Sequence, residues 1–304
     1  MVKPNFLIVG AAKAGTTSLY YYLNQHPEIQ MSKVKEPFFF AYMNDPNVTF
    51  RSGDNPEIIT SSSEYEKLYD LSANHKVLGE SSTWYLYLYE KTIKNIKEYY
   101  ENVEPKIIVF LRNPIERCWS HYQMNVDNGW EDSTKTFEEV IEPKIIKQRL
   151  SNSWAPTYDY IGYGMYYEQV NAYIKNFSNV KIFLFDEFIK NRENVFLEIF
   201  NFLGIDNEFK PNTKVKYNFS GNPKNKFLNY ILFEDNNVKK FLRPLIDKMN
   251  SVKFIDDMVL RIRSGNKEKI EMNSETKHKL NIIYKDKILK LQELLNIDLN
   301  HWLD

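Results

Sequence analysis

Cysteine is nearly absent from this chain of 304 residues. The single cysteine, Cys118, excludes a disulfide within the chain and a cysteine-rich metal site. It stands between Arg117 and Trp119 in a stretch that we expect to be helical, where a thiol usually fills space in a core. We therefore interpret Cys118 as a packing residue rather than as a nucleophile.

Net charge and long apolar runs are also missing. Lysine and arginine number 40, as do aspartate and glutamate, so the zero net charge gives no support for binding to DNA, RNA or an anionic membrane. No segment approaches the roughly 18 apolar residues of a membrane span. The apolar run from Phe6 to Ala12 is short for a signal peptide and is followed directly by Lys13. We therefore expect a cytoplasmic protein without a nucleic-acid or membrane partner.

Apolar and aromatic residues are plentiful. Hydrophobic residues make up 43% of the chain and aromatic residues 15%, which is enough for a substantial core. No internal repeat or linker divides the sequence, so we predict one domain over residues 1–304. Apolar runs at residues 6–9 and 106–111 each precede a segment with helical spacing. These units predict an α/β fold in which a central parallel sheet is flanked by helices.

Other elements are expected from apolar spacing and from turn residues. Short strands are expected at residues 29–31 and 77–80. A third apolar strand is expected at residues 180–187, ending in the carboxylates of Asp186 and Glu187. Helices are expected at residues 63–71, 92–100, 137–150, 166–177, 194–203 and 274–295.

The stretch from Pro4 to Leu23 indicates a buried strand, a tight loop and a helix. Gly10 and Gly15 have the spacing of a P-loop, but Thr16 occupies the position of its lysine, and the lysine of this loop is Lys13. Such a loop can bind a phosphate or sulfate through its backbone N–H groups and the helix N-terminus. A P-loop kinase or NTPase would also need Mg²⁺ ligands, for which the sequence offers no convincing aspartate at a strand end. An ordinary strand-to-helix turn is the other interpretation.

A second strand-to-helix unit follows at Lys106–Leu111. Asn113 is a plausible N-cap, and Pro114 suits the first helical position. Arg112 would then lie at the carboxyl end of a strand, where open α/β sheets bind their ligands. Ser120 would lie about two turns into the helix.

Three further segments carry candidate functional side chains. Glu36 lies on expected extended backbone before Pro37, between lysines and phenylalanines, and composition alone favours a solvated patch beside a core anchor. Glu80 ends the strand expected at residues 77–80. The loop Asn218–Lys224 is polar and basic, and an exposed turn is the plain interpretation.

Taken together, these segments resemble the sulfotransferases that use 3′-phosphoadenosine 5′-phosphosulfate (PAPS). The run G-A-A-K-A-G-T-T-S-L resembles the 5′-phosphosulfate loop of that family. The run I-V-F-L-R-N-P, followed by Arg117 and Ser120-His121-Tyr122, resembles its 3′-phosphate motif. The resemblance covers nearly the whole chain, as far as the last helix and Trp302. It implies a P-loop-like three-layer fold and an enzyme without a metal.

PAPS carries phosphates at both ends of its adenosine, so the resemblance implies two anion sites. The 5′-phosphosulfate is expected to contact the first loop and helix at Lys13, Ala14, Gly15, Thr16, Thr17 and Ser18. The 3′-phosphate is expected at Arg112 and Ser120, with Asn218, Ser220 and Lys224 in a loop over the nucleotide. Lys13 is also a predicted catalytic residue, because a cation at the bridging oxygen stabilises the charge that develops as the S–O bond breaks. The product is adenosine 3′,5′-bisphosphate.

The acceptor must lose a proton, and the resemblance predicts Glu36 as the base because Lys35-Glu36-Pro37-Phe38-Phe39 resembles a motif of carbohydrate sulfotransferases. His121 is the rival base, since histidine is the commonest one, although it points about 100° away from Ser120 on the helix. Acceptor contacts are expected at Glu36, Phe39, Glu80, Trp84 and Tyr85. Ser81-Ser82-Thr83 replaces a lysine followed by Ser/Thr-Pro in the family, which puts a second catalytic lysine in doubt.

We predict transfer of a sulfuryl group from PAPS to the hydroxyl or amine of a small molecule, for example in natural-product biosynthesis. A broad basic groove for a highly sulfated polysaccharide gets no support from a zero net charge. A saccharide acceptor is the alternative. A P-loop kinase or NTPase and a non-catalytic nucleotide-binding module are the alternatives from other classes. The oligomeric state is not indicated.

Overall fold

The computed structural model describes residues 3–51, 56–70, 75–132, 134–214, 222–223, 267–268 and 271–303. The chain divides into two compact units, Met1–Pro211 with Asn273–Asp304, and Asn212–Met272. In the second unit, β6 (Asn222–Pro223) pairs antiparallel with β7 (Lys267–Glu268). The single domain over residues 1–304 stays a prediction.

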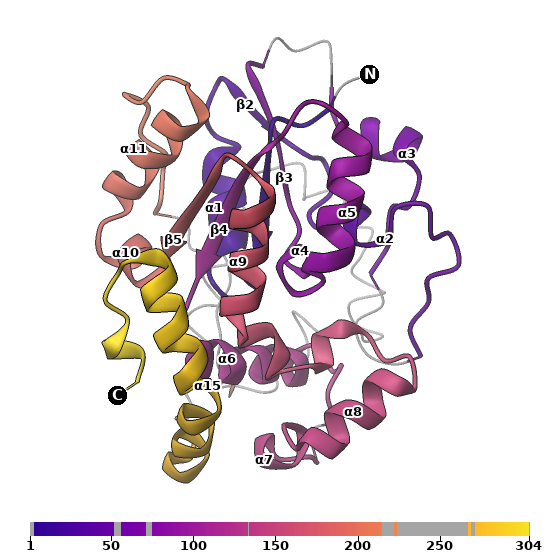
Figure 1. Cartoon of the computed structure of the whole chain (residues 1–304), viewed down its shortest axis with the longest axis vertical. Helices are drawn as coiled ribbons and strands as arrows, with labels where there is room; N and C mark the ends of the chain where they lie inside the picture. Colours follow the sequence, from indigo (N-terminus) through magenta and orange to yellow (C-terminus); the bar gives the residue numbers. More distant parts are fainter. Residues whose placement is uncertain are drawn as a thin grey trace, which may run out of the picture. The chain divides into compact units, whose positions relative to one another are not determined.

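The first unit is built on a parallel sheet of five strands in the order β2-β3-β1-β4-β5. The strands are β1 (Phe6–Gly10), β2 (Ile29–Met31), β3 (Val77–Ser81), β4 (Lys106–Leu111) and β5 (Val180–Leu184). Figure 1 shows helices on both sides of the sheet, with α9 in front of the strands and α1 behind them. The predicted α/β fold with a central parallel sheet is confirmed.

The central strands are buried on both faces. In β1 the side chains of Phe6, Leu7, Ile8 and Val9 have no exposed surface, and neither do those of Ile107–Leu111 in β4. Because helices cover both faces of a parallel sheet, its inner strands are continuous apolar runs rather than alternating ones. This is why these two strands were predicted from the sequence with nearly their observed bounds.

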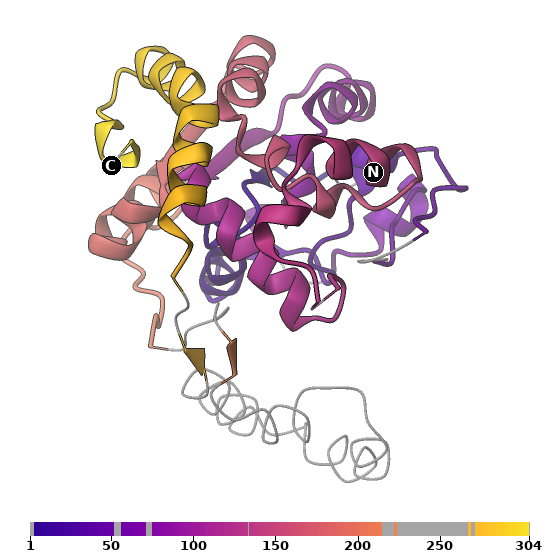
Figure 2. The same cartoon turned by 90° about the horizontal axis from the view of Figure 1, so that it is seen from below.

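The helices that surround the sheet are mostly short. The α-helices are α1 (Thr16–Leu23), α2 (Phe39–Tyr42), α3 (Ser62–Glu66), α4 (Trp84–Tyr87), α5 (Tyr89–Tyr100), α6 (Pro114–Asp127), α7 (Phe137–Val140), α8 (Pro143–Ser151), α9 (Tyr166–Asn176), α10 (Phe185–Lys190), α11 (Arg192–Leu203) and α15 (Ser274–Leu295). Short 3₁₀ turns lie at Pro156–Tyr158, Gly162–Gly164 and Asn300–Trp302. The last helix, α15, packs against α9 and α6 (Figure 2). None of the described helices is long and apolar enough to cross a membrane.

Several predicted elements were wrong in their bounds. The helix expected at residues 63–71 ends at Glu66, in α3. The helix expected at residues 137–150 is broken into α7 and α8. Helix α8 begins at Pro143, and proline is disfavoured inside a helix because it has no N–H group and its ring clashes with the preceding turn. The strand expected at residues 180–187 ends at Leu184, and Asp186 and Glu187 lie in the first turn of α10. Carboxylates are favourable there because they face the positive end of the helix dipole.

Candidate active site

Three loops meet at the carboxyl edge of the sheet. Because β1, β3 and β4 are parallel neighbours, the residues after each strand lie at the same edge. The backbone N–H of Ala11 donates to the carbonyl of Phe110 at 2.6 Å, and that of Ser82 donates to the carbonyl of Ile8 at 3.1 Å. Ligands of open α/β folds bind at this edge.

The first loop is shaped by residues with a left-handed backbone. Lys13 has φ 66° and Gly15 has φ 85°. A Cβ atom on Gly15 would lie 2.9 Å from the ring of Phe185, so this position requires glycine for both conformation and space. Helix α1 then begins at Thr16, and the residue before it gives no side-chain cap. The first N–H groups of α1 are therefore arranged for an anion.

Lys13 is a half-buried cation in this loop. No described residue forms a hydrogen bond or an ion pair with its ammonium group, whose nearest charges include Arg112, Asp127 and Lys35. Burial, followed by repulsion from Arg112, lowers the pKa of Lys13 to about 8, although Asp127 acts in the opposite direction. An ammonium that is partly desolvated and surrounded by other cations favours an anionic ligand.

Arg112 follows β4 directly and contacts the lysine loop. Its Nη1 donates to the carbonyl of Lys13 at 3.3 Å, and its guanidinium lies 5.1 Å from the centre of the Phe185 ring. Its Nη2 also donates to Glu116 Oε2 at 3.0 Å. The Glu116 side chain is 59% exposed, so an anionic ligand can replace it at low cost.

The helix after Arg112 begins as the sequence predicted. The side-chain oxygen of Asn113 accepts from the N–H groups of Ile115 and Glu116, and Pro114 is the first helical residue. Ser120 lies in the same helix and is 2% exposed. The predicted pair of Arg112 and Ser120 therefore lies on one strand-to-helix unit, beside the Lys13 loop.

Glu36 is held by two neighbours, one for each oxygen. Its Oε2 accepts from the backbone N–H of Thr83 at 2.8 Å and from the hydroxyl of Thr83 at 2.7 Å. Its Oε1 lies 2.8 Å from Lys35 Nζ. The side chain is 19% exposed, so a ligand can reach it. Because Thr83 follows β3, the parallel neighbour of β1, its bonds place Glu36 on the same edge of the sheet as the first loop.

His121 is enclosed and fully hydrogen-bonded. It is 1% exposed; its Nδ1 lies 3.0 Å from Arg117 Nη1, and its Nε2 lies 2.7 Å from the Thr157 hydroxyl. Arginine can only donate, so Nδ1 is the acceptor and Nε2 carries the proton. Burial, followed by the charge of Arg117, lowers the pKa of His121 well below its usual value. Neither ring nitrogen of His121 has a free lone pair for a substrate proton, so we do not propose His121 as the base.

The expected acceptor contacts differ in their accessibility. Phe39, Glu80 and Tyr85 have no exposed surface, and we assign none of them a direct acceptor contact. Trp84 is 3% exposed and lies in an aromatic cluster with Phe38, Tyr42 and Phe50, with the rings of Phe38 and Trp84 4.3 Å apart. Asn218, Ser220 and Lys224 lie outside the described residues.

Thr83 is the hydrogen-bond partner of Glu36 that the sequence analysis did not predict. It is 47 positions from Glu36 in the chain, and no local pattern links the two. The sequence signal that could have indicated it is the run of hydroxyl residues Ser81-Ser82-Thr83 at the carboxyl end of a strand. Ligands of open α/β sheets bind at such strand ends.

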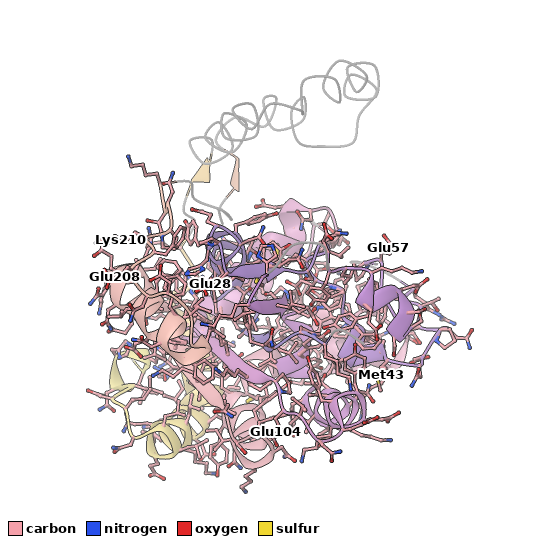
Figure 3. All side chains as sticks on the ribbon, turned by 90° about the horizontal axis from the view of Figure 1, so that it is seen from above. Glu28, Met43, Glu57, Glu104, Glu208 and Lys210 are labelled. Carbon is pink, nitrogen blue, oxygen red and sulfur yellow. The ribbon has the colours of Figure 1, made fainter. Side chains whose placement is uncertain are left out.

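A pocket on the opposite edge of the sheet does not compete with this site. It has a volume of about 330 Å³, and its lining includes Lys3, Lys106 and Glu104, the last labelled in Figure 3. Lys3 donates to the carbonyl of Tyr99, and Lys106 to the carbonyls of Phe202 and Leu203. Among the described residues, no group of three or more histidine, cysteine, aspartate or glutamate side chains could hold a metal ion.

Comparison with known proteins gives a consistent result. The model of the sulfotransferase domain family matches residues 3–274. A sulfotransferase from Alicyclobacillus acidocaldarius is similar over 100% of both chains, with 26% sequence identity and a TM-score of 0.75. This similarity assigns the sheet and its helices to a P-loop-like fold.

Two curated relatives match over part of the chain. The membrane-associated sulfotransferase kil1 of Dictyostelium discoideum is 31% identical over 123 residues, which are 40% of this chain and 23% of the relative. Carbohydrate sulfotransferase 15 of Mus musculus is 28% identical over 151 residues, which are 39% of this chain and 27% of the relative. The matched region thus spans about a quarter of the length of each of these relatives.

Proposed function

Since the chain belongs to the sulfotransferase domain family, we propose that it transfers a sulfuryl group from PAPS to a hydroxyl or amine of a small-molecule acceptor. The observation that carries this proposal is the position of Lys13, Arg112 and Glu36 at one edge of the sheet. Lys13, Arg112 and Glu36 are each partly exposed, so a ligand can reach them. The exposed Glu116 carboxylate that now contacts Arg112 can be replaced by an anionic ligand.

The described residues fit a nucleotide with two separate anionic ends. The uncapped start of α1 and the ammonium of Lys13 suit the 5′-phosphosulfate, with Ala14, Gly15, Thr16, Thr17 and Ser18 in the same loop and helix. Arg112 suits the 3′-phosphate because its planar guanidinium can donate two hydrogen bonds to one phosphate. Ser120, two turns further on, would supply a hydroxyl.

PAPS, when bound, supplies an activated sulfuryl group. Lys13 would hold a positive charge beside the oxygen that joins sulfur to phosphorus. Negative charge develops on that oxygen as the S–O bond breaks, and a well-placed donor stabilises such charge by about 3–4 kcal/mol.

Glu36 would remove the proton of the acceptor. A carboxylate has about four lone-pair sites, of which Thr83 occupies two on Oε2 and Lys35 one on Oε1. The remaining site is on Oε1, so this oxygen would take the proton as the acceptor oxygen or nitrogen forms its bond to sulfur. The products are the sulfated acceptor and adenosine 3′,5′-bisphosphate.

A small acceptor with an aromatic or other flat face is supported by the ring cluster next to Glu36. Trp84 directly follows Thr83, and its ring contacts Phe38, Tyr42 and Phe50. Phe50 is half-buried, so part of this cluster reaches the surface. Aromatic rings bind flat apolar faces of ligands.

A saccharide acceptor is the second candidate, since one relative has the name carbohydrate sulfotransferase 15. Sugar rings also have apolar faces that suit aromatic clusters. Incubation with ³⁵S-labelled PAPS and a panel of phenols, aliphatic alcohols, amines and oligosaccharides tests both candidates. Label transfer to phenols or amines alone supports the first candidate, and transfer to oligosaccharides alone supports the second. Hydrolysis of ATP that depends on Mg²⁺, without sulfuryl transfer, would overturn both.

A further inference from the structure

Glu80 is a buried carboxylate without an ion-pair partner among the described residues. It lies near the end of β3 and has no exposed surface. Three hydroxyls donate to it: Ser82 Oγ to Oε1 at 2.6 Å, Tyr65 OH to Oε2 at 2.6 Å and Tyr85 OH to Oε2 at 3.1 Å. Burying a carboxylate costs free energy even when it is hydrogen-bonded, so this arrangement calls for a reason.

Two of these hydroxyls also bind the segment that follows Glu36. The backbone N–H of Phe38 donates to Ser82 Oγ at 3.2 Å, and that of Phe40 donates to Tyr85 OH at 3.1 Å. A hydroxyl has one proton, and here that proton goes to Glu80. The lone pairs of each hydroxyl oxygen are thereby left for the two backbone amides.

The same two segments meet again at Glu36 itself. Thr83 is adjacent to Ser82 in the chain, and it gives both of its hydrogen bonds to Glu36 Oε2. Residues 36–40 are therefore joined to residues 82–85 by bonds at Glu36, Phe38 and Phe40. Glu80 orients the hydroxyls of two of these three links.

We propose that Glu80 is a positioning residue, whose carboxylate aligns Ser82 and Tyr85 so that they fix the segment carrying Glu36 against Thr83. This inference rests on the proposed function, in which Glu36 is the base. It assigns Glu80 a role in turnover without contact with either substrate. A misplacement of about 1 Å in a reacting group can cost a hundredfold in rate, so a positioning residue of this kind is visible in kcat.

The protonation of the surrounding groups fits this role. Burial, followed by the nearby charge of Glu80, raises the pKa of Tyr65 and that of Tyr85 well above the usual value. Both phenols therefore keep the protons that they donate. Burial raises the pKa of Glu80 to about 7, while the hydrogen bonds from Ser82, Tyr65 and Tyr85 lower it. The three donors favour the ionised form, and above pH 7 this form, which accepts all three hydrogen bonds, predominates.

The test compares Glu36→Gln, Glu80→Gln and the double variant. Glutamine fills the space of Glu80 but presents an N–H group to hydroxyls that must themselves donate, so the two links are disturbed. We expect Glu80→Gln to lower kcat about tenfold to a hundredfold, while the affinity for adenosine 3′,5′-bisphosphate, measured by calorimetry, stays unchanged. In the Glu36→Gln background, Glu80→Gln should lower kcat by less than about twofold, because no base remains to be positioned.

Tyr100→Phe is the matched control. Tyr100 is also a buried tyrosine, but its hydroxyl donates to the carbonyl of Pro4 rather than to Glu80. Its loss should lower the melting temperature and leave kcat unchanged. Tyr85→Phe removes one of the two links and should therefore lower kcat by less than Glu80→Gln does. This loss should also disappear in the Glu36→Gln background. The variant replaces Glu80→Gln in the test if Glu80→Gln does not fold.

The outcomes separate the two proposals. Wild-type kcat in Glu80→Gln, or an equal loss of kcat with and without Glu36, would overturn the positioning role. Wild-type kcat in Glu36→Gln would remove Glu36 as the base, and the role of Glu80 with it. A loss in Glu36→Gln together with wild-type kcat in both Glu80→Gln and Tyr85→Phe would leave the proposed function intact and refute only the inference on Glu80.

Discussion

Thr83 gives both of its hydrogen-bond donors to one oxygen of Glu36, the N–H at 2.8 Å and the hydroxyl at 2.7 Å. The carboxylate is therefore fixed by a backbone group that cannot rotate away and by a side chain that is 6% exposed. Its other oxygen contacts only Lys35 among the described residues. A general base needs such a fixed orientation together with one open lone pair.

The Thr83 hydroxyl can be tested by a nearly isosteric change. Thr83→Val removes one donor to a carboxylate and keeps the backbone donor. Since a hydrogen bond to a charged group contributes about 1.5–3 kcal/mol, we expect kcat to fall roughly tenfold to a hundredfold. Thr92→Val is the matched control, because the buried hydroxyl of Thr92 has no hydrogen-bond partner among the described residues. Equal kcat values for the two variants would contradict the role of Thr83.

Lys13 is expected to contribute to turnover more than to folding. Lys13→Ala removes a cation that no described residue pairs with, so its melting temperature should equal or exceed that of the wild type. Its kcat should fall about 10²- to 10³-fold, as for other donors at a developing oxyanion. Lys33→Ala, on an exposed lysine of the same chain, is the control. Turnover of Lys13→Ala within a few-fold of the control would remove the catalytic role.

The same lysine predicts a pH dependence of nucleotide binding. With its pKa lowered to about 8, the free protein loses the Lys13 charge as the pH rises above 8. Only the charged form attracts the nucleotide, so affinity for adenosine 3′,5′-bisphosphate should be constant below that pH and weaken above it. The limiting slope is about tenfold per pH unit. Calorimetry between pH 7 and 9.5 measures the effect, and Lys13→Ala should bind weakly but without this slope.

Arg112 is expected to recognise the 3′-phosphate. The wild type should bind adenosine 3′,5′-bisphosphate more tightly than adenosine 5′-monophosphate, and Arg112→Ala should reduce that preference about tenfold or more. Glu116→Gln removes the exposed carboxylate that Arg112 now contacts, so it should raise the preference a few-fold. A preference that neither variant changes would place the 3′-phosphate elsewhere.

His121 is expected to matter for stability rather than for proton transfer. In His121→Asn the side-chain oxygen can still accept from Arg117, whereas His121→Leu leaves a buried guanidinium N–H unpaired, which costs about 1–3 kcal/mol. Denaturant unfolding should therefore rank the leucine variant as the less stable. Both should keep kcat within a few-fold of the wild type. A loss in His121→Asn as large as in Glu36→Gln, with unchanged stability, would restore His121 as the base.

The parts of the site that were predictable from the sequence are the local ones. The Lys13 loop and the Arg112 unit each consist of an apolar strand, a short loop and a helix start within about 15 residues. The predicted fold and family are confirmed. The break before α8 also has a local cause, Pro143. The helical spacing of apolar residues continues on both sides of this proline, and one uninterrupted helix was predicted for that reason.

The contacts of Glu36 and Glu80 could not be predicted in the same way. The bonds to Thr83, Ser82 and Tyr85 connect residues more than 40 positions apart, and they form because the segments that follow β2 and β3 lie side by side where these two strands pair in the sheet. Composition indicated a solvated Lys/Glu patch at Glu36, because hydroxyl partners from another strand leave no periodic signal. The burial of Glu80 was missed for the same reason.

The central claim is that the first loop and the Arg112 unit bind the two ends of one nucleotide. Calorimetric titration with adenosine 3′,5′-bisphosphate in the presence of EDTA tests it most directly. We predict saturable one-to-one binding that weakens about tenfold or more when the 3′-phosphate is absent. No binding by the folded protein, or equal affinity for adenosine 5′-monophosphate, would contradict the claim.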